Sequence, residues 1–418
     1  MSRAVTKSAL VPKLRFPEFR GAEGWKPETI GSYLVDCSER VPSDTELPIY
    51  SSTRDGLKRQ DVYFDGKVLQ NNNDYGAVPP DCFVYRHMSD DGLFKFNINE
   101  TGGDIAVSKE YPVFRTSGLN SRFLLAKLND DFDFRQFALS QKAGGTRTRL
   151  YFSKLCEWQT LLPSIAEQQK IADCLSSLDE LIATQARKVD ALKTHKKVLM
   201  QQLFPREGET QPRLRFPEFR DAGEWEEKRL EQLGRVIRGA SPRPKSDPRY
   251  FGGPIPRLMV QDVTRDGKWV TPQIDSLTDE GAELSRPCPA GTLTIVCSGN
   301  VGIVSFLAVD ACIHDGFLAL IDIDESISTK DFLFHCLSTL REEFEKSATH
   351  GGVFTNLTTT VISQFKICHP PFAEQQRIAT CLTSLDDLIT AQIQALETLK
   401  THKKGLMQQL FPAAEVSA

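Results

Sequence analysis

The chain has 418 residues, of which 40% are hydrophobic and 25% are charged, an ordinary composition for a globular protein of two or three domains. The formal net charge of −4 excludes a chain coated with positive charge, so any binding of a polyanion must depend on local basic patches. No run of about eighteen apolar residues occurs, and residues 1–16 contain no apolar segment typical of a signal peptide. We therefore expect a cytoplasmic protein that does not enter a membrane.

The cysteines and histidines indicate no metal site. The ten cysteines are scattered without a CxxC pair, and the seven histidines add no zinc-finger spacing. Cys312 with His314 alone would supply too few ligands. We expect reduced, mostly buried thiols, as is usual in cytosolic proteins.

A short aromatic segment occurs twice. LRFPEFR spans Leu14–Arg20 and is followed by Trp25, and the same seven residues recur at Leu214–Arg220 before Trp225. We expect the aromatic side chains of this lead-in to fill an apolar groove rather than to carry chemistry. The polar segment 206–212 is typical of an exposed linker between two halves.

Each lead-in precedes a globular stretch, residues 26–163 and 226–370. The two stretches show almost no similarity to each other until GGTRTRL at Gly144–Leu150 aligns with GGVFTNL at Gly351–Leu357. Short runs rich in β-branched and aromatic residues, separated by turn residues, predict strands. The expected strands include Asp81–Tyr85, Thr292–Cys297 and Phe317–Ile323, and the expected helices include Ser328–Lys346. We therefore predict two mixed α/β modules.

The most regular feature is a long stretch that also occurs twice. Ala166–Pro205 and Ala373–Pro412 align without a gap, and roughly two-thirds of their positions are identical, which marks a duplicated unit. Apolar residues recur at steps of three and four, as in a helix with a heptad seam. The seam residues are Ile171, Leu175, Leu178, Ile182, Val189, Leu192, Leu199 and Leu203 in the first copy, and Ile378, Leu382, Leu385, Ile389, Leu396, Leu399, Leu406 and Leu410 in the second.

A narrow seam of this kind favours one partner helix, and the obvious partner is the other copy. Each helix would extend about 60 Å. Two seam positions are polar in both copies, Gln185 with Gln392 and Lys196 with Lys403, which lowers stability but can fix the register. The alternative is that each amphipathic helix packs only on its own globular neighbour.

Basic residues gather in the divergent stretches, among glycine, proline and aromatic residues. Such loops suit a DNA surface, because cations neutralise phosphates while arginine, asparagine, serine and aromatic side chains reach base edges. A solvated charged loop is the alternative for each residue. The candidate DNA-binding residues are Arg147, Arg149, Tyr151, Arg238, Ser241, Arg243, Lys245, Tyr250, Thr355 and Asn356. Thr355 and Asn356 align with Thr148 and Arg149, so the same loop is expected to recognise a different base in the second half.

No constellation for catalysis stands out. HPPF at His369–Phe372 resembles the (D/N/S)PP(Y/F) signature of amino-methyltransferases, but the leading residue is His and no glycine-rich loop for a methyl donor precedes it. The prolines coincide with the start of the long helix, where proline is favoured. No phosphate-binding GxxxxGK[ST] loop and no Ser/His/Asp or paired-carboxylate constellation is present. We expect a non-catalytic component.

These features divide the chain into seven parts. They are a lead-in (1–25), a first module (26–163), a first long helix (164–205), a linker with the repeated lead-in (206–225), a second module (226–370), a second long helix (371–412) and a tail (413–418).

Two variable modules, each followed by an AEQQ(K/R)IA…LD(E/D)LI…KTHKK helix and each preceded by LRFPEFR and a tryptophan, resemble the specificity subunit of type I restriction-modification systems. The resemblance covers essentially the full chain, and the repeated helix is its specific part. Arg238–Pro256 and SGNVG at Ser298–Gly302 are also similar to the family. The resemblance implies two target recognition domains joined by two long conserved helices, which form an antiparallel coiled coil in a pseudo-twofold tandem repeat.

The resemblance also implies function and partners. Each recognition domain would recognise one half of a bipartite, asymmetric site in double-stranded DNA, and the paired helices would set the spacer between the halves. Two modification (methyltransferase) subunits would dock on the chain, with LRFPEFR, AEQQ and the exposed helix faces as candidate surfaces, and restriction (translocase and nuclease) subunits would join. This chain would bind no cofactor itself, and S-adenosylmethionine would be bound by the methyltransferase subunits.

Two other functions fit the residues. One is a stand-alone tandem DNA-binding regulator, and the other is a coiled-coil adaptor whose modules bind proteins. Association with an adenine methyltransferase would separate the specificity subunit from the regulator. Salt-sensitive, sequence-dependent DNA binding would argue against the adaptor, because phosphate contacts weaken steeply with salt.

Overall fold

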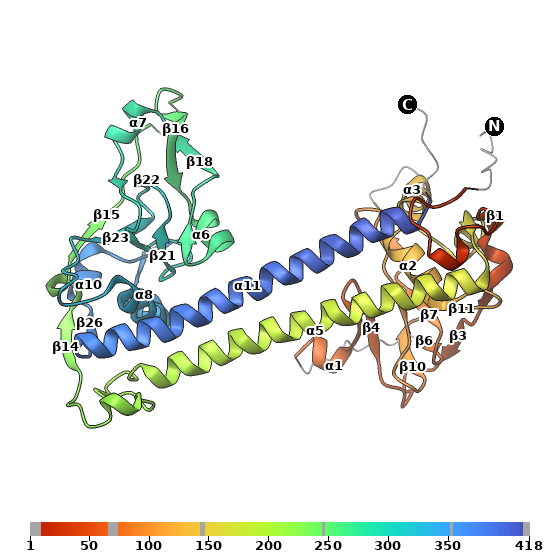
Figure 1. Cartoon of the computed structure of the whole chain (residues 1–418), viewed down its shortest axis with the longest axis horizontal. Coiled ribbons are helices and arrows are strands. Elements are labelled where there is room, and N and C mark those ends of the chain that lie inside the picture. The colour runs from red at the N-terminus through yellow and green to blue at the C-terminus, as the bar shows by residue number, and fades with distance from the viewer. Residues whose placement is uncertain (1–9, 66–73, 143–146, 245–246, 352–353, 413–418) are drawn as a thin grey trace. The chain divides into compact units, whose positions relative to one another are not determined.

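The computed structural model describes residues 10–65, 74–142, 147–244, 247–351 and 354–412. The chain divides into two compact units, residues 1–186 with 394–418 and residues 187–393. Each unit combines one globular module with a segment of both long helices (Figure 1). Unit 1 is therefore built from two separate stretches of the chain, whereas unit 2 is one continuous stretch.

The module of unit 1 contains two small antiparallel sheets. The larger sheet has the order β2 (Leu34–Asp36), β11 (Val113–Thr116), β7 (Phe83–Tyr85) and β9 (Phe96–Ile98). The smaller sheet has the order β10 (Ile105–Ser108), β6 (Tyr75–Val78) and β3 (Glu39–Val41). Three further strand pairs are β1 (Lys26–Thr29) with β13 (Gln159–Leu162), β4 (Tyr50–Thr53) with β5 (Gly56–Arg59), and β8 (Met88–Ser89) with β12 (Thr148–Arg149).

The module of unit 2 also contains two sheets, each of which includes one parallel pairing. Its larger sheet has the order β15 (Arg235–Arg238), β23 (Phe317–Ile321), β20 (Leu293–Val296), β21 (Val304–Leu307) and β17 (Trp269–Val270). Its second sheet has the order β18 (Asp275–Leu277), β16 (Phe251–Leu258), β22 (Ala311–Ile313) and β19 (Pro287–Cys288). The remaining pairs are β14 (Glu226–Arg229) with β26 (Lys366–His369), and β24 (Thr349–Gly351) with β25 (Phe354–Asn356).

Four strands of each larger sheet correspond, and the sheet of unit 2 has a fifth strand, β17, at one edge. These four strands lie in the same order in both modules, as β2-β11-β7-β9 and β15-β23-β20-β21, with the last strand of the chain second in the order. All of these pairings are antiparallel. The duplication seen in the helices therefore extends through the modules, whose sequences show little trace of it.

Each module also contains short helices, and two long helices each have segments in both units. Unit 1 contains α1 (Gln60–Tyr63), α2 (Ser121–Asp130), α3 (Phe132–Ser140) and α4 (Phe152–Cys156). Unit 2 contains α6 (Val260–Asp266), α7 (Asp279–Glu283), α8 (Lys330–Thr339), α9 (Arg341–Ser347) and α10 (Thr359–Gln364). The long helices are α5 (Ile165–Leu203) and α11 (Phe372–Leu410).

The predicted fold class, two mixed α/β modules with two long helices, is confirmed, and the three expected strands contain β7, β20 and β23. The helix expected over 328–346 is instead two helices, α8 and α9. They are separated at Leu340, whose ψ of 14° is not helical. Just before it, the hydroxyls of Ser338 and Thr339 donate to the carbonyls of Phe334 and Cys336. Side-chain bonds of this kind compete with the regular helix ladder and often bend it.

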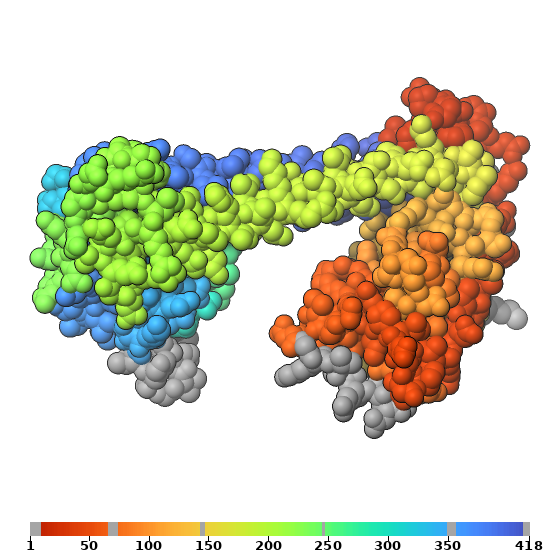
Figure 2. All heavy atoms as spheres, turned by 90° about the horizontal axis from the view of Figure 1, so that it is seen from below, coloured from red at the N-terminus to blue at the C-terminus, as the bar shows by residue number. Residues whose placement is uncertain are grey.

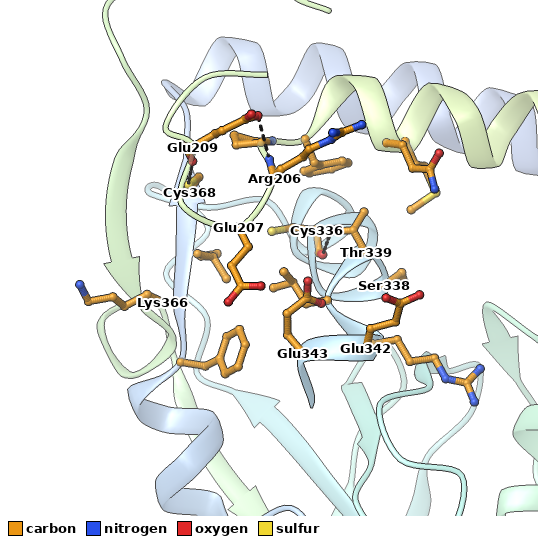
Figure 3. A pocket seen from close by; sticks show the side chains of 18 of the residues that line it. Arg206, Glu207, Glu209, Cys336, Ser338, Thr339, Glu342, Glu343, Lys366 and Cys368 are labelled. Carbon is orange, nitrogen blue, oxygen red and sulfur yellow. Dashed lines mark hydrogen bonds between the residues drawn. The ribbon is translucent and has the colours of Figure 1, made fainter. Parts of the chain in front are cut away.

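The long helices pair antiparallel within each unit, and both views show them side by side (Figures 1 and 2). In unit 1, seam residues Ile171 and Leu175 at the start of α5 share one core with Leu410 at the end of α11. In unit 2, Leu203 at the end of α5 shares a core with Ile378 near the start of α11. The expected seam is thus confirmed, and the helices contact each other as well as the modules.

The polar seam lysines form ion pairs across the two helices. Lys403 of α11 donates to Asp179 of α5 at 2.7 Å in unit 1, and Lys196 of α5 bonds to Asp386 of α11 in unit 2. Asp179 and Asp386 occupy equivalent positions of the repeat, as do the two lysines. Each lysine therefore finds its acid in one register only, as a polar seam position requires.

Each module core is closed by the end of the long helix from the other half. Trp25 of unit 1 is fully buried, and its ring meets Phe411, directly after α11, with centroids 5.9 Å apart. In unit 2, Trp225 is buried against Phe332 and against Phe204, directly after α5. The expectation that the lead-in tryptophans fill an apolar groove is confirmed, and aromatic side chains from both halves form that groove.

The lead-in and AEQQ form a buried clasp inside each unit. The guanidinium of Arg15 donates to both carboxylate oxygens of Glu167, at 2.8 and 2.7 Å, and Trp25 Nε1 donates to the same carboxylate at 3.2 Å. The repeat forms the same bidentate pair between Arg215 and Glu374. Arg15, Glu167 and Glu374 are buried, so these side chains cannot contact a partner. Other residues of the two segments, such as Glu18 and Gln169, are exposed, and docking through them stays a prediction.

The next residue of AEQQ ties the long helix to a module helix. Gln168 accepts from the backbone N–H of Asn120, which caps α2, and donates to the carbonyl of Pro163. Gln375 accepts from the N–H of Thr329, the cap of α8, and donates to the carbonyl of Pro370. AEQQ is thus a structural joint that fixes each module on its long helix.

Candidate DNA interface

The predicted DNA loop of unit 1 is held against the segment that follows strand β7. The N–H of Leu150 donates to the carbonyl of His87 at 2.8 Å, and strand β12, which contains Arg149, pairs with β8. The loop therefore lies beside residues 87–91. This arrangement brings the predicted residues Arg147, Arg149 and Tyr151 to one surface of the module.

These three side chains are exposed and differ in their partners. Arg147 donates to Asp90 at 2.7 Å. The ring of Tyr151 is 52% exposed and stacks on His87, with centroids 5.6 Å apart. Arg149 is also exposed. An arginine pair beside an exposed aromatic ring can contact a phosphate, a base edge and a base face at the same place.

The sequence reasoning missed three residues at this surface. Arg54 donates to both carboxylate oxygens of Asp91 at 2.7 Å, and this contact holds the pKa of Asp91 below its usual value. His87 lies under Tyr151, and burial lowers its pKa. The signal was available in RHMSDDG, a polar run directly after a predicted strand. Arg54 comes from the β4–β5 hairpin, and only the tertiary structure brings it here.

The corresponding loop of unit 2 is anchored in the same way. The N–H of Leu357, which aligns with Leu150 in the repeat, donates to the carbonyl of Cys297 at 2.9 Å. Cys297 directly follows strand β20, the counterpart of β7, and its own N–H donates to the carbonyl of Gly316. Both candidate interfaces therefore occupy the same place in their modules.

In unit 2 the predicted polar residues converge on Asp315. Ser241 donates to one carboxylate oxygen of Asp315 at 2.6 Å and Arg243 to the other at 3.2 Å. Arg238 donates to the backbone carbonyl of Asp315 at 3.1 Å. Arg257 reaches the hydroxyl of Ser241 and pairs with Asp275. Asp315 was not among the predicted residues, yet it fixes the positions of three of them.

The other predicted residues of unit 2 are Tyr250, Thr355, Asn356 and Lys245. Tyr250 is buried at 8% exposure, and its carbonyl accepts from the N–H of Thr278. It therefore supports the loop, and its ring offers little exposed surface to DNA. Thr355 and Asn356 lie in strand β25, paired with β24. Lys245 lies outside the residues that the structure describes.

The acidic partners do not prevent these arginines from meeting DNA. In the Arg147–Asp90 pair the side chains are 53% and 70% exposed, and in the Arg243–Asp315 pair 64% and 40%. Exposed pairs of this kind contribute only about 0–1 kcal/mol, and salt screens them. The carboxylates hold the guanidinium groups in place while leaving N–H groups for an incoming phosphate or base.

The described residues contain neither a cluster of three or more His, Cys, Asp and Glu side chains able to hold a metal ion nor a helix long and apolar enough to span a membrane. All ten cysteines carry free thiols. His369 of HPPF is buried and bonds to Gln375, which also bonds to Pro370. HPPF therefore ends at Phe372, the first residue of α11, in agreement with the interpretation of its prolines as a helix start.

A duplicated pair of α/β modules on two antiparallel helices, with arginine-bearing loops at equivalent strand ends, defines a two-module specificity protein. The family described as type I restriction modification DNA specificity domain matches residues 92–194 and 222–398, and the chain belongs to this family.

Relatives of similar sequence are named specificity subunits of type I restriction enzymes. The chain is 27% identical over 354 residues to the putative type I restriction enzyme MjaX specificity subunit of Methanocaldococcus jannaschii, covering 79% of this chain and 80% of that one. It is 28% identical over 150 residues to the HindI specificity subunit of Haemophilus influenzae, covering 35% and 32%. Both names describe specificity subunits of type I restriction enzymes.

Solved structures show the same fold. The S subunit of a type I restriction-modification system from M. genitalium superposes with a TM-score of 0.58 at 15% identity, covering 97% of this chain and 100% of that one. A chain from a study of type I R-M complex assembly and conformational transition gives 0.56 at 19% identity, covering 93% and 98%. The fold expected from the resemblance is thus confirmed.

Proposed function

We propose that this chain recognises a bipartite DNA site, with each module recognising one half. The observation that carries the proposal is the pair of loops anchored at the same strand end in both modules, after β7 and after β20. The anchors correspond, whereas the polar residues around them differ. Loops that are anchored in the same way but carry different contact residues suit two half-sites of different sequence.

The chemistry of each loop supports a different preference. Exposed arginines such as Arg147 and Arg149 can pair with the O6 and N7 atoms of guanine. In unit 2, the Asp315 cluster presents Arg238 and Arg243, and the aligned loop carries Asn356, whose amide matches adenine. Methylation mapping would identify the target bases.

The proposal assigns catalysis to other chains. Two modification subunits would dock on this chain, bind S-adenosylmethionine and methylate an adenine flipped out of the helix. Restriction subunits with translocase and nuclease activity would join the same complex in the cytoplasm. The family membership of this chain and its duplicated frame support this assignment.

The test is methylation mapping in cells that carry the complete system. With the native chain we expect methylated adenines in a site of two constant blocks separated by an unspecified spacer. Combined Arg147→Ala and Arg149→Ala substitution removes contacts of unit 1 only, so we expect one block to lose specificity while the other stays unchanged. Each lost bidentate base contact corresponds to about 1–3 kcal/mol of discrimination.

A matched change in unit 2, Arg238→Ala with Arg243→Ala, should affect the other block. Lys154→Ala, which removes an exposed lysine paired with Glu157, serves as a charge control and should leave both blocks intact. Equal loss of both blocks in either folded double variant would contradict separate recognition by the two modules.

A further inference from the structure

One carboxylate lies at the centre of the candidate DNA interface of unit 2. Asp315 directly precedes Gly316, whose carbonyl accepts from the N–H of Cys297, and the carbonyl of Cys297 accepts from the N–H of Leu357. These two backbone bonds hold Asp315 beside the anchored loop that carries Asn356. A negative charge at a surface that meets phosphates is unfavourable by itself, because like charges repel. Its position there therefore needs an explanation.

Two side chains hold the carboxylate of Asp315 in a fixed orientation. Ser241 donates to Oδ1 at 2.6 Å, and Arg243 donates to Oδ2 at 3.2 Å. Ser241 in turn accepts from Arg257, which is only 7% exposed and pairs with Asp275. The side chain of Asp315 nevertheless remains 40% exposed, and that of Arg243 64% exposed. An incoming group can therefore reach a preoriented pair of one acceptor and one donor.

The hydrogen-bonding chemistry of this pair matches one base pair. An ionised carboxylate only accepts hydrogen bonds, and a guanidinium only donates them. In the major groove of DNA, cytosine presents its N4 amino donor, whereas guanine presents the O6 and N7 acceptors. The N4 amino group and O6 are neighbours, because they bond to each other across the C·G pair. Asp315 and Arg243, which are in contact, can therefore meet both bases of one pair.

The other three bases oppose the carboxylate. Thymine places the O4 acceptor where the carboxylate needs a donor, and guanine places O6 and N7 there. Adenine offers its N6 amino donor, but the N7 acceptor beside it repels the second carboxylate oxygen. Asp315 would thus discriminate by repelling the wrong bases as well as by binding the right one.

The equivalent position of unit 1 carries the opposite charge. Extending the register of β7 and β11 beyond its paired residues places Glu110 opposite His87, whose carbonyl anchors the loop of unit 1. Gly316 has the same place in unit 2. The preceding residue is Lys109 in unit 1 and Asp315 in unit 2. Opposite charges at one place of a shared frame are expected where two modules recognise different bases.

We infer that Asp315 is a specificity-determining residue, which together with Arg243 recognises one C·G pair in the half-site of unit 2. The inference rests on the proposed function, because it requires that unit 2 recognises a half-site. The carboxylate accepts from the N4 amino group of cytosine, and the guanidinium donates to the guanine of the same pair.

Methylation mapping of the complete system tests the inference, with the block of unit 2 identified as the one that Arg238→Ala with Arg243→Ala alters. In the native site we expect one position of this block to be C·G only. Asp315→Asn keeps the size of the side chain and an acceptor oxygen, but its amide can also bond bidentately to N6 and N7 of adenine. We expect the preference for C·G over A·T to fall by roughly tenfold or more at that position alone.

Binding of the complete complex to DNA duplexes that differ only at this position measures the same ratio directly. Asp315→Glu keeps the negative charge, so the preference for C·G should remain while binding weakens. Asp322→Asn is the matched control, because Asp322 is an exposed aspartate that pairs with Arg235 beyond the opposite end of β23. This control should leave every position of both blocks unchanged.

Two results would overturn the inference while leaving bipartite recognition intact. The first is a native block of unit 2 without an obligatory C·G pair, which is measured on the native chain and does not depend on the folding of a variant. The second is a uniform loss of methylation in Asp315→Asn with every base preference retained, since Asp315 would then only support the loop. A native site without two constant blocks would instead overturn the proposed function itself.

Discussion

At the scale of single residues, the repeat shows which side chains serve the frame. Arg15–Glu167 and Arg215–Glu374 are bidentate, buried and present in both halves. Losing one member of such a pair leaves an uncompensated buried charge, which typically costs about 3–5 kcal/mol. LRFPEFR and AEQQ are therefore repeated because together they close the clasp that holds each long helix on its module.

His369 provides a prediction about pH. Its ring is buried, and Nε2 lies 3.1 Å from the side-chain nitrogen of Gln375, an amide nitrogen that can donate but not accept. Burial lowers the pKa of His369 to about 4. The unfolded chain, with a pKa near 6.5, therefore binds the proton first as pH falls. We expect this histidine to remove about 2 kcal/mol of stability between about pH 6.5 and 4.

The residue at the equivalent position in unit 1 is Leu162, which suggests the test. His369→Leu should remove this part of the pH dependence, as measured by urea unfolding at several pH values. Stability above pH 7 should change little by comparison. Equal pH dependence in the native and variant proteins would show that the ring does not stay neutral in the fold.

At the scale of elements, the register of the helix pair depends on a few polar contacts among apolar ones. Lys196→Asp should lower the stability of unit 2 by about 1 kcal/mol or slightly more, because the partner Asp386 is only about a fifth exposed and would face a second carboxylate. Adding Asp386→Lys restores an ion pair and should recover most of the loss. Chemical unfolding of the single and double variants gives the coupling energy.

The same exchange in unit 1 supplies an internal comparison. Lys403 contacts Asp130 of α2 as well as Asp179. Exchanging Lys403 with Asp179 leaves Asp130 facing a new carboxylate, so recovery should be smaller there than in unit 2. Full recovery in both units would indicate that Asp130 contributes nothing to the register.

The ends of the long helices show how elements from distant parts of the sequence complete one core. Phe411 contacts both Trp25 and Phe123 in unit 1. We expect Phe411→Ala to destabilise unit 1 by about 3–5 kcal/mol, in the range for removing a buried aromatic ring. Tryptophan fluorescence would measure this loss of stability, because the change in its emission wavelength on unfolding should occur at a lower urea concentration in the variant. Val309→Ala, at a 37% exposed position of unit 2, is the control and should have a small effect.

At the scale of the whole molecule, each long helix has segments in both units. We therefore expect the helix length to set the spacer between the two proposed half-sites. Inserting one heptad next to Gln185, with a matching heptad next to Gln392, keeps the seam continuous. Seven residues add about 10 Å of helix, close to the rise of three base pairs. We expect the unspecified spacer of the methylated site to lengthen by about three base pairs.

Methylation mapping of cells carrying this extended chain is the measurement. Both constant blocks should keep their sequences, since neither module is altered. An unchanged spacer with intact methylation would show that helix length does not set the separation. A control chain with seven residues inserted in the linker after Pro205 should keep the native spacer.

The sequence by itself determined the elements that have a periodic apolar pattern or occur twice, which are the two long helices. Steps of three and four residues, two polar seam positions and a long gapless repeat were sufficient to predict two long helices and their pairing. The family was indicated by the resemblance of the AEQQ…KTHKK helices and the LRFPEFR lead-ins. The DNA loops could be proposed from local composition. Their anchoring at Leu150 and Leu357 could not, because a backbone hydrogen bond to a distant strand end leaves no side-chain pattern.

Only the tertiary structure decided which residues meet across the chain. It brought Arg54 to Asp91 and gathered three predicted residues around Asp315, and it removed Tyr250 from the surface. It also revealed that four strands of the larger sheet have the same order in both modules although the module sequences have diverged. The reason is physical: seam periodicity is a local property of one helix, whereas sheet order and charge clusters depend on contacts between segments far apart in the sequence.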